Sequence, residues 1–163
     1  MLATALAVGT CHAILRRLYS GRTAMSKIIH IAAALLLDAQ GKTLLVRKGG
    51  TTAFMQPGGK IEAHEQPVEA LARELFEELG LSIDTQEAEY LGQFSAPAAN
   101  EPGFEVRCEL FRVHSAATVQ PAAEIEEACW VDIDKVEHLE LAPLTRDLIL
   151  PLQRDFAEDR RGA

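Results

Sequence analysis

One amphipathic helix constrains the fold of this chain more than any other feature. The sequence predicts it from Pro67 to about Leu79. Pro67 suits the first helical turn, where its missing N–H would have no partner, and Gly80 suits the left-handed position that ends a helix. Between them, apolar residues recur at helical spacing on one face: Val68, Leu71, Leu75 and Leu79. We expect that face to pack against another layer of the protein.

The opposite face of this helix carries three glutamates, Glu74, Glu77 and Glu78, at positions i, i+3 and i+4. Like charges at this spacing destabilise a helix, so their presence favours a cationic partner. Carboxylate oxygens suit hard ions such as Mg²⁺ and Mn²⁺, and no cysteine or paired histidine lies nearby to favour zinc. Taken alone, however, the three glutamates are better explained as a solvated acidic surface.

The rest of the chain predicts mixed strands and helices around one central sheet, which is the α/β class in layers. Two antiparallel strands joined by a turn at 38–41 are expected at Ile28–Leu37 and Thr43–Arg47. Gly49–Met55 is expected to be a loop, and Pro57–Gly59 to interrupt regular structure. Further strands are predicted at Tyr90–Phe94, Phe104–His114 and Cys129–Ile133, with a loop at Pro97–Gly103. The last helix is expected at Pro143–Phe156, with a kink or break at Pro151.

Length and charge narrow the class of protein. The chain has 163 residues, which suits one domain, and its net charge of −8 disfavours binding to extended nucleic acid. The three cysteines, Cys11, Cys108 and Cys129, show no zinc or disulfide spacing and favour reduced thiols in a cytoplasmic protein. The apolar run Met1–Ile14 is too short to span a membrane, and its charges follow it rather than precede it as in an export signal.

We therefore expect residues 1–26 to be a dispensable extension, 27–157 to be the domain and 158–163 to be a tail. The extension resembles an organelle transit segment faintly, because no acidic residue precedes Asp38. Alternatively, the natural chain starts at Met25.

A wider pattern extends across the helix and the loop before it. Gly59 is followed by five residues and then Glu65, and seven more residues lead to Arg73-Glu74-Leu75-Phe76-Glu77-Glu78-Leu79-Gly80-Leu81. This segment resembles the Nudix box at every defining position, and Pro57-Gly58 resembles its usual lead-in. The chain is thus similar to the MutT-like Nudix hydrolases over roughly Lys27 to Phe156. The resemblance implies a Nudix-type α/β/α sandwich with a central mixed sheet.

The resemblance also implies roles for individual residues. Glu77 and Glu78 correspond to the principal metal ligands, the backbone oxygen of Gly59 to a further ligand, and Glu74 to a ligand or the general base. Glu65 and Arg73 are expected to pair and orient Glu74; the alternative for Arg73 is an exposed partner of Glu69 or Glu77.

One more acidic ligand is expected from the segment before Trp130. Glu124 is our first choice and Glu127 the second, although these glutamates could equally solvate a loop.

The function implied is the hydrolysis of a diphosphate linkage, dependent on Mg²⁺ or Mn²⁺, in a small nucleoside diphosphate derivative. ADP-ribose-like compounds and nucleoside triphosphates are the two candidates, and Pro97, 16 positions beyond the box, is a weak marker of the first. Possible substrate contacts are Phe54, Phe94, Phe104, Arg47, Lys48, Lys60 and Arg107.

Two alternatives remain: a catalytically silent nucleotide-sensing domain, and an isoprenyl diphosphate isomerase using Cys108 or Cys129. The first is disfavoured because all box carboxylates are present. Family members are often homodimers, and no membrane partner is expected.

Overall fold

The computed structural model describes residues 27–162, and of residues 159–162 the backbone alone. The predicted extension and Cys11 lie outside this range. Its elements in chain order are β1 (Lys27–Leu37), β2 (Thr43–Lys48), β3 (Phe54–Met55), β4 (Gly58–Lys60), α1 (Pro67–Leu79), β5 (Glu89–Pro97), β6 (Phe104–His114), β7 (Ile125–Val131), a π-helical turn (Thr145–Ile149) and α2 (Leu150–Gly162).

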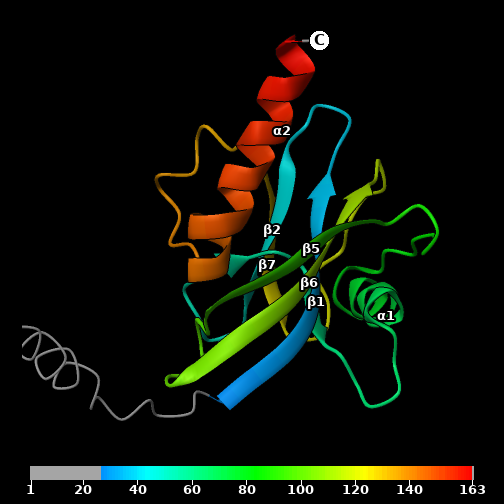
Figure 1. The fold of residues 1–163 in the computed structure, drawn as a ribbon, viewed down its shortest axis with the longest axis vertical. Helices are drawn as coiled ribbons and strands as arrows, with labels where there is room; N and C mark the ends of the chain where they lie inside the picture. Colours follow the sequence, from blue (N-terminus) through cyan, green and yellow to red (C-terminus); the bar gives the residue numbers. More distant parts are fainter. Residues whose placement is uncertain (1–26, 163) are drawn as a thin grey trace, which may run out of the picture.

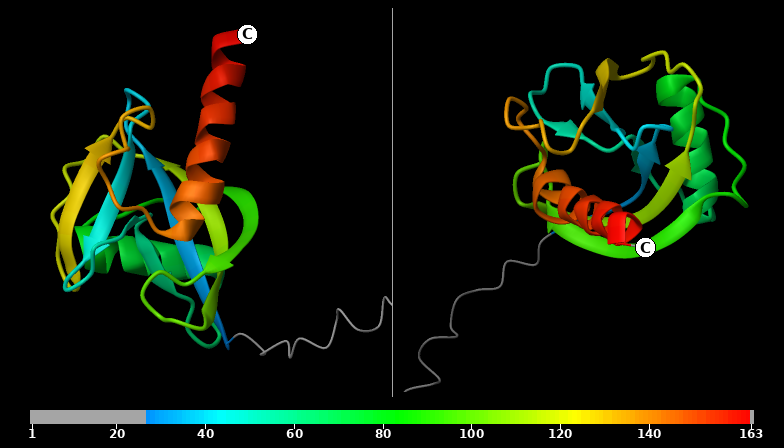
Figure 2. Two further views of the ribbon diagram at one scale, coloured as in Figure 1. Left: turned by 90° about the vertical axis from the view of Figure 1, so that its left-hand side faces the viewer. Right: turned by 90° about the horizontal axis from the view of Figure 1, so that it is seen from above.

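The described strands form one mixed sheet with the order β3-β2-β1-β6-β5. Strands β1 and β6 run parallel along their whole length, whereas β2 pairs antiparallel with β1, and β5 with β6. Strand β4 pairs with β1, and β7 with β2. Helices α1 and α2 lie on opposite sides of this sheet (Figures 1 and 2). The predicted α/β sandwich with a central mixed sheet is therefore correct.

The apolar run of β1 is continuous because both faces of this strand are covered. Side chains alternate across a strand, so Ala32, Ala34 and Leu36 pack with α1 and its surroundings, while Ala33, Leu35 and Leu37 pack toward the C-terminal helix. The π-helical turn contributes Ile149 to that second layer. Burial on both faces thus fixes β1 at the centre of the molecule.

Helix α1 has the predicted bounds. Pro67 is its first residue, the Gln66 backbone N–H donates to the Glu69 carboxylate at 3.0 Å, and Gly80 ends it with a φ of 65°. The predicted apolar face is buried at Leu71, Leu75 and Leu79. Local sequence and tertiary packing agree along the whole helix.

Several predicted bounds were wrong, and Gly58–Gly59 is the case that matters most. We expected no regular structure there, yet Gly58, Gly59 and Lys60 form β4, paired with Ala33, Ala32 and Ile31. Gly58 has a φ of 140°, and an added Cβ would lie 2.2 Å from the Ala32 carbonyl oxygen. Glycine is needed because the two backbones approach so closely, and it does not interrupt the sheet.

The remaining differences concern the ends of elements. The expected loop Gly49–Met55 contains the short strand β3, and β5 continues to Pro97, which an edge strand tolerates. Strand β7 begins at Ile125 instead of Cys129, so Glu126 and Glu127 lie in a strand and not in a loop. The last helix includes a π-helical turn just before Pro151 and continues to Gly162 through the predicted tail. No helix in the described part of the chain is long and apolar enough to cross a membrane.

Candidate functional site

The candidate site forms where α1 faces β4. The Glu74 carboxylate lies against the Cα of Gly59, because a Cβ added there would stand 2.3 Å from the Glu74 Cδ atom. The backbone N–H of Gly58 donates to Oε2 of Glu78 at 3.2 Å. The absence of side chains on Gly58 and Gly59 therefore allows two box carboxylates to lie directly against the backbone of β4.

Glu78 is the buried member of the three glutamates, with 1% of its surface exposed. Its Oε1 atom has no hydrogen-bond partner among the described residues. Burial raises the pKa of Glu78 to about 7, and the Gly58 N–H and the charge of Lys48 offset only part of this effect. A buried carboxylate with an unused oxygen is costly to maintain, which favours a cationic ligand for it.

Lys48, at the end of β2, supplies one cation at this point. Its ammonium lies 3.8 Å from Oε1 of Glu78 and contacts the carboxylate of Glu124. Burial alone would lower the pKa of Lys48, but the hydrogen bond with Glu124 and the charge of Glu78 outweigh this effect and raise it. Lys48 therefore remains charged between two carboxylates.

Glu124 reaches Lys48 because the segment before β7 is bound to the end of α1. The backbone N–H groups of Gln120 and Ala122 donate to the carbonyls of Leu79 and Glu78, which have no acceptor role inside the helix. The Gly49 N–H in turn donates to the Glu124 carbonyl at 2.9 Å. These bonds place Glu124, the first choice from the sequence, beside Lys48.

The second choice, Glu127, lies elsewhere. Its carboxylate pairs with Arg47 at 3.0 Å, and Glu126 pairs with the same guanidinium at 2.9 Å. Arg47 also lies over the Phe54 ring. Arg47 is thus engaged with the β7 glutamates and not with the box carboxylates.

Arg73 lies between Glu65 and Glu74, as the orienting hypothesis requires. Its Nε and Nη2 donate to the two oxygens of Glu65 at 2.9 and 3.0 Å, and its Nη1 donates to Oε1 of Glu74 at 2.8 Å. The pKa of Arg73 is raised and that of Glu65 lowered by this pairing. The alternative contact with Glu77 is also present at 3.5 Å but is the longer one. Arg73 therefore bridges the carboxylates of Glu65 and Glu74.

Glu77 is half-exposed, with 52% of its side chain accessible, and within residues 27–158 no three acidic, histidine or cysteine side chains converge closely enough to hold a metal ion as they stand. Two observations nevertheless fit a hard dication here. Oε1 of Glu78 is buried without a partner, and a cationic group, the Lys48 ammonium, already stands between Glu78 and Glu124. The oxygen donors that would hold the ion are those of Glu74, Glu77, Glu78 and Glu124 and the Gly59 carbonyl.

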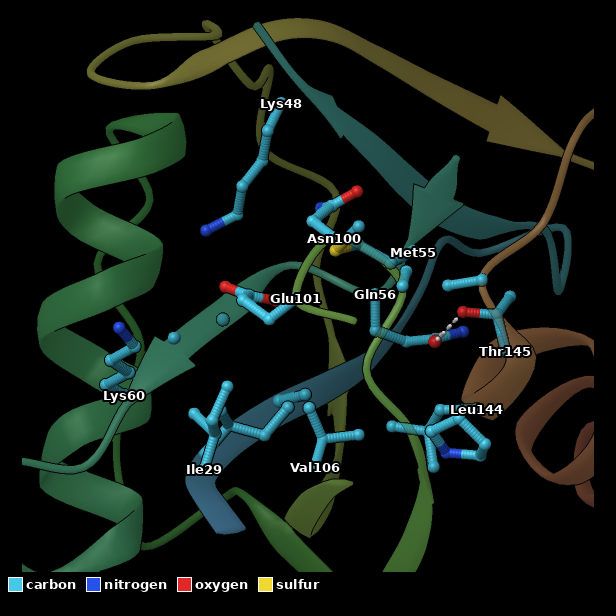
Figure 3. Close-up of a pocket in the computed structure, with 17 residues that line it drawn as sticks. Ile29, Lys48, Met55, Gln56, Lys60, Asn100, Glu101, Val106, Leu144 and Thr145 are labelled. Atoms are coloured by element: carbon cyan, nitrogen blue, oxygen red, sulfur yellow. Dashed lines mark hydrogen bonds between the residues drawn. The ribbon is translucent and has the colours of Figure 1, made fainter. Parts of the chain in front are cut away.

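A cavity of about 130 Å³ adjoins β4. Gly58, Gly59, Lys48 and Lys60 line the end beside α1, and Gln56, Leu144 and Thr145 line the opposite end (Figure 3). Its wall is mostly apolar, and Pro97 contributes to it. Two lysines therefore line one end of the cavity, and a buried polar pair, Gln56 and Thr145, lines the other.

The sequence did not single out Gln56 or Thr145, and it did not distinguish Lys48 from the other basic residues. Phe54 is buried in the core, Phe94 packs against the α2 side, and neither Phe104 nor Arg107 lines the cavity. Gln56 and Thr145 are 89 positions apart, and no motif spans that distance. Only the fold brings them together.

The fold and the box define a family. The model of the NUDIX domain matches residues 28–152, so the chain belongs to the Nudix family. Membership suggests a pyrophosphohydrolase, and the family is typically dependent on divalent metal.

Among curated relatives, the phosphatase NudJ of Escherichia coli strain K12 is 41% identical over 70 residues. That match covers 42% of this chain and 46% of NudJ, so it spans less than half of either protein.

Solved structures agree on the fold. The MutT protein of Methanosarcina mazei matches with a TM-score of 0.65 and 24% identity over 83% of this chain and 97% of that one. The MutT NUDIX hydrolase of Burkholderia pseudomallei matches with a TM-score of 0.64 and 23% identity over 78% and 98%. At these identities the likeness establishes the architecture.

Proposed function

We propose that this chain is a metal-dependent pyrophosphohydrolase that cleaves a diphosphate linkage in a small nucleoside diphosphate derivative. ADP-ribose-like compounds and nucleoside triphosphates remain the two candidate substrates, and the cytoplasm the proposed location. The observation that carries the proposal is the buried, partly unpaired carboxylate of Glu78, set beside Lys48 against the bare backbone of Gly58. A solvated acidic surface would not bury one of its carboxylates.

The chain's own residues support each part of the reaction. Lys48 and Lys60 line the cavity and provide positive charge for the phosphates. Glu74, which contacts Arg73 and Gly59, would accept a proton from the attacking water. As the water oxygen bonds to phosphorus, the anhydride oxygen leaves with the electron pair of the broken bond. Mg²⁺ or Mn²⁺ would supply Lewis acidity, which polarises the phosphoryl oxygens and neutralises the leaving phosphate.

The competing functions have less support. Cys108 is fully buried, and burial raises the pKa of its thiol to about 12, so it stays protonated. Neither Cys108 nor Cys129 is among the residues lining the cavity, which disfavours the isomerase. The relative NudJ is named a phosphatase, which favours hydrolysis over silent sensing.

A panel of nucleoside diphosphate and triphosphate derivatives with Mg²⁺ or Mn²⁺ tests the proposal by the release of phosphate or nucleotide. We expect turnover of at least one compound, lost in excess chelator. Glu77→Gln and Glu78→Gln should each lower kcat at least about 100-fold with the fold intact by circular dichroism. Glu126→Gln, which changes the charge equally but contacts Arg47, is the matched control and should keep the rate. Binding without any turnover would instead indicate a sensor.

A further inference from the structure

The inner end of the cavity holds a buried amide with a donor that has no partner. Gln56 is 5% exposed, and its Oε1 accepts a hydrogen bond of 2.7 Å from the hydroxyl of Thr145, which is fully buried. Its Nε2 has no acceptor among the described residues. Leaving such a donor unpaired costs about 1–3 kcal/mol. Methionine would fill the same space without this cost, so folding alone does not explain a glutamine here.

The contact with Thr145 involves the oxygen end of the Gln56 amide. The Thr145 hydroxyl donates to the amide oxygen, so the carbonyl is engaged and the NH₂ group is the one left over. The dyad therefore offers a donor and selects an acceptor. Nε2 itself is closed off from solvent. The terminal torsion of glutamine is broad, and rotation about it is the movement that would turn this donor toward a group in the cavity.

The shape and lining of the cavity limit what that group can be. Ile29, Ile31, Val106 and Leu144 form apolar walls, and an apolar cavity of about 150 Å³ accepts one benzene ring. The observed volume of about 130 Å³ is comparable. One flat ring fits these walls, and its polar edge would meet Gln56. The lysines at the other end are placed for the phosphates of the same molecule (Figure 3).

We infer that Gln56, oriented by Thr145, is a specificity-determining residue that selects substrates whose heterocyclic ring presents a carbonyl oxygen or unprotonated ring nitrogen at its inner edge. This inference rests on the proposed function for the identity of the substrate as a nucleotide. A site built to hydrogen-bond a ring discriminates strongly against rings that leave its buried donor unpaired. The unpaired amide is then the cost of selectivity in the empty protein.

Nuclear magnetic resonance of the ¹⁵N-labelled full chain tests this without any turnover. The probes are AMP, GMP, CMP and UMP, with ribose 5-phosphate as the control that lacks a ring. We expect at least one nucleotide to shift the Gln56 side-chain amide signals, which are identified by their loss in Gln56→Met, and ribose 5-phosphate to leave them in place. If none of the nucleotides binds more tightly than ribose 5-phosphate, the inference is overturned.

Two variants then separate selectivity from packing. Gln56→Met should weaken binding of the preferred nucleotide at least about tenfold and reduce the difference between nucleotides. The matched control is Gln153→Met, because Gln153 is another buried glutamine with one unpaired atom but bonds Gly41 and does not line the cavity. It should leave binding unchanged. Equal binding by the wild type and Gln56→Met contradicts the inference. If Gln56→Met folds less well, the shift of the Gln56 amide signals in the wild type still tests the inference, because that measurement does not use the variant's affinity.

The outcomes also distinguish this inference from the proposed function. Selective nucleotide binding that depends on Gln56, with no hydrolysis of any compound, supports the inference and defeats the proposed function. The opposite outcome is hydrolysis in which the ratios of kcat/KM between nucleotides are the same in the wild type and Gln56→Met. It supports the proposed function and contradicts the inference.

Discussion

At the scale of single residues, the burial of Glu78 links the stability of the fold to the proposed function. Its pKa is raised from 4.5 to about 7 by burial, so the folded state binds its proton more tightly than the unfolded state. Such a group lowers the free energy of unfolding as the pH rises from about 4.5 to 7, and the whole cost is present above 7. A shift of this size corresponds to a cost on the order of 3 kcal/mol. Burial of this proposed metal ligand therefore destabilises the metal-free fold.

We therefore expect Glu78→Gln to be more stable than the wild type at pH 8 in chelator, by up to that amount. The difference should shrink as the pH falls from about 7 to 4.5, and below 4.5 Glu78 is protonated in both states of the wild type. Urea denaturation at pH 5 and pH 8 measures this. Glu77→Gln removes the same charge from a half-exposed neighbour. Its free energy of unfolding should fall between pH 5 and pH 8 as much as that of the wild type. A Glu78→Gln variant that is less stable than the wild type at pH 8 would show that the buried charge is compensated.

Alanine substitutions at the two adjacent glycines of β4 should affect stability and activity differently. Gly58→Ala combines a φ of 140° with a Cβ 2.2 Å from a backbone oxygen, so it should lower the free energy of unfolding by several kcal/mol. Gly59→Ala instead displaces the Glu74 side chain, which can move, so most of the stability should remain while kcat falls. Thermal unfolding and steady-state kinetics on both variants separate the two effects. Comparable stability losses at both positions would contradict this distinction.

The sequence predicts which candidate site residues lie close together where one local motif contains them. Gly59, Glu74 and Glu78 are placed together, and Arg73 contacts Glu65, because one loop and one helix carry them all. Their chemical roles stay predictions. The choice between Glu124 and Glu127, and the importance of Lys48 and Gln56, depend on contacts between segments distant in the chain. Local sequence contains no information about those contacts.

At the scale of elements, prediction succeeded where several local signals agree. Helix α1 has a proline start, a glycine end and a regular apolar stripe, and β6 has the predicted bounds. It failed at β4, where glycine reads as a breaker but is required by the close approach to β1, and at β7, whose charged residues are tolerated because Arg47 pairs with them. Tertiary contacts override propensity at both strands.

Packing of α1 gives a prediction at this scale. Leu75 is fully buried against the sheet, so Leu75→Ala should lower the free energy of unfolding by about 2–5 kcal/mol. The adjacent Phe76 is 61% exposed, and Phe76→Ala should change it by less than about 0.5 kcal/mol. Denaturant titration of the two variants compares them directly. A large loss from Phe76→Ala would indicate that this ring is covered in solution by something outside the described residues.

At the scale of the whole molecule, the two faces of the sheet have separate tasks. On the α1 side, Ala32, Ala34 and Leu36 of β1 pack in the core layer beneath the helix that carries the carboxylates. On the other face of the same strand, Ile29, Ile31 and Ala33 line the cavity. Strand β4 lies at the junction, since its glycines contact the carboxylates and also line the cavity. A ligand in the cavity and a cation on the carboxylates would therefore meet across β4.

This arrangement predicts that divalent metal stabilises the folded chain. A ligand that binds only the folded state adds about 2.7 kcal/mol at 100 times its Kd, so Mn²⁺ should raise Tm, and chelator should reverse the rise. Glu78→Gln and Glu124→Gln should each reduce this shift, because both carboxylates contact Lys48 at the expected position of the ion. Glu126→Gln and Glu127→Gln are the controls, since both of these glutamates pair with Arg47 instead.

The net charge of −8 makes such controls necessary, because any acidic protein attracts dications weakly. If metal binds nonspecifically, all four substitutions should reduce the Tm shift equally, and the shift should vanish at high salt. If metal binds at the box, only Glu78→Gln and Glu124→Gln should reduce the Tm shift. The shift should then persist in added salt, because Glu78 is buried and its charge is screened little. Equal shifts in the wild type and in Glu78→Gln would mean that metal does not bind at the box, and the hydrolytic proposal would lose its basis.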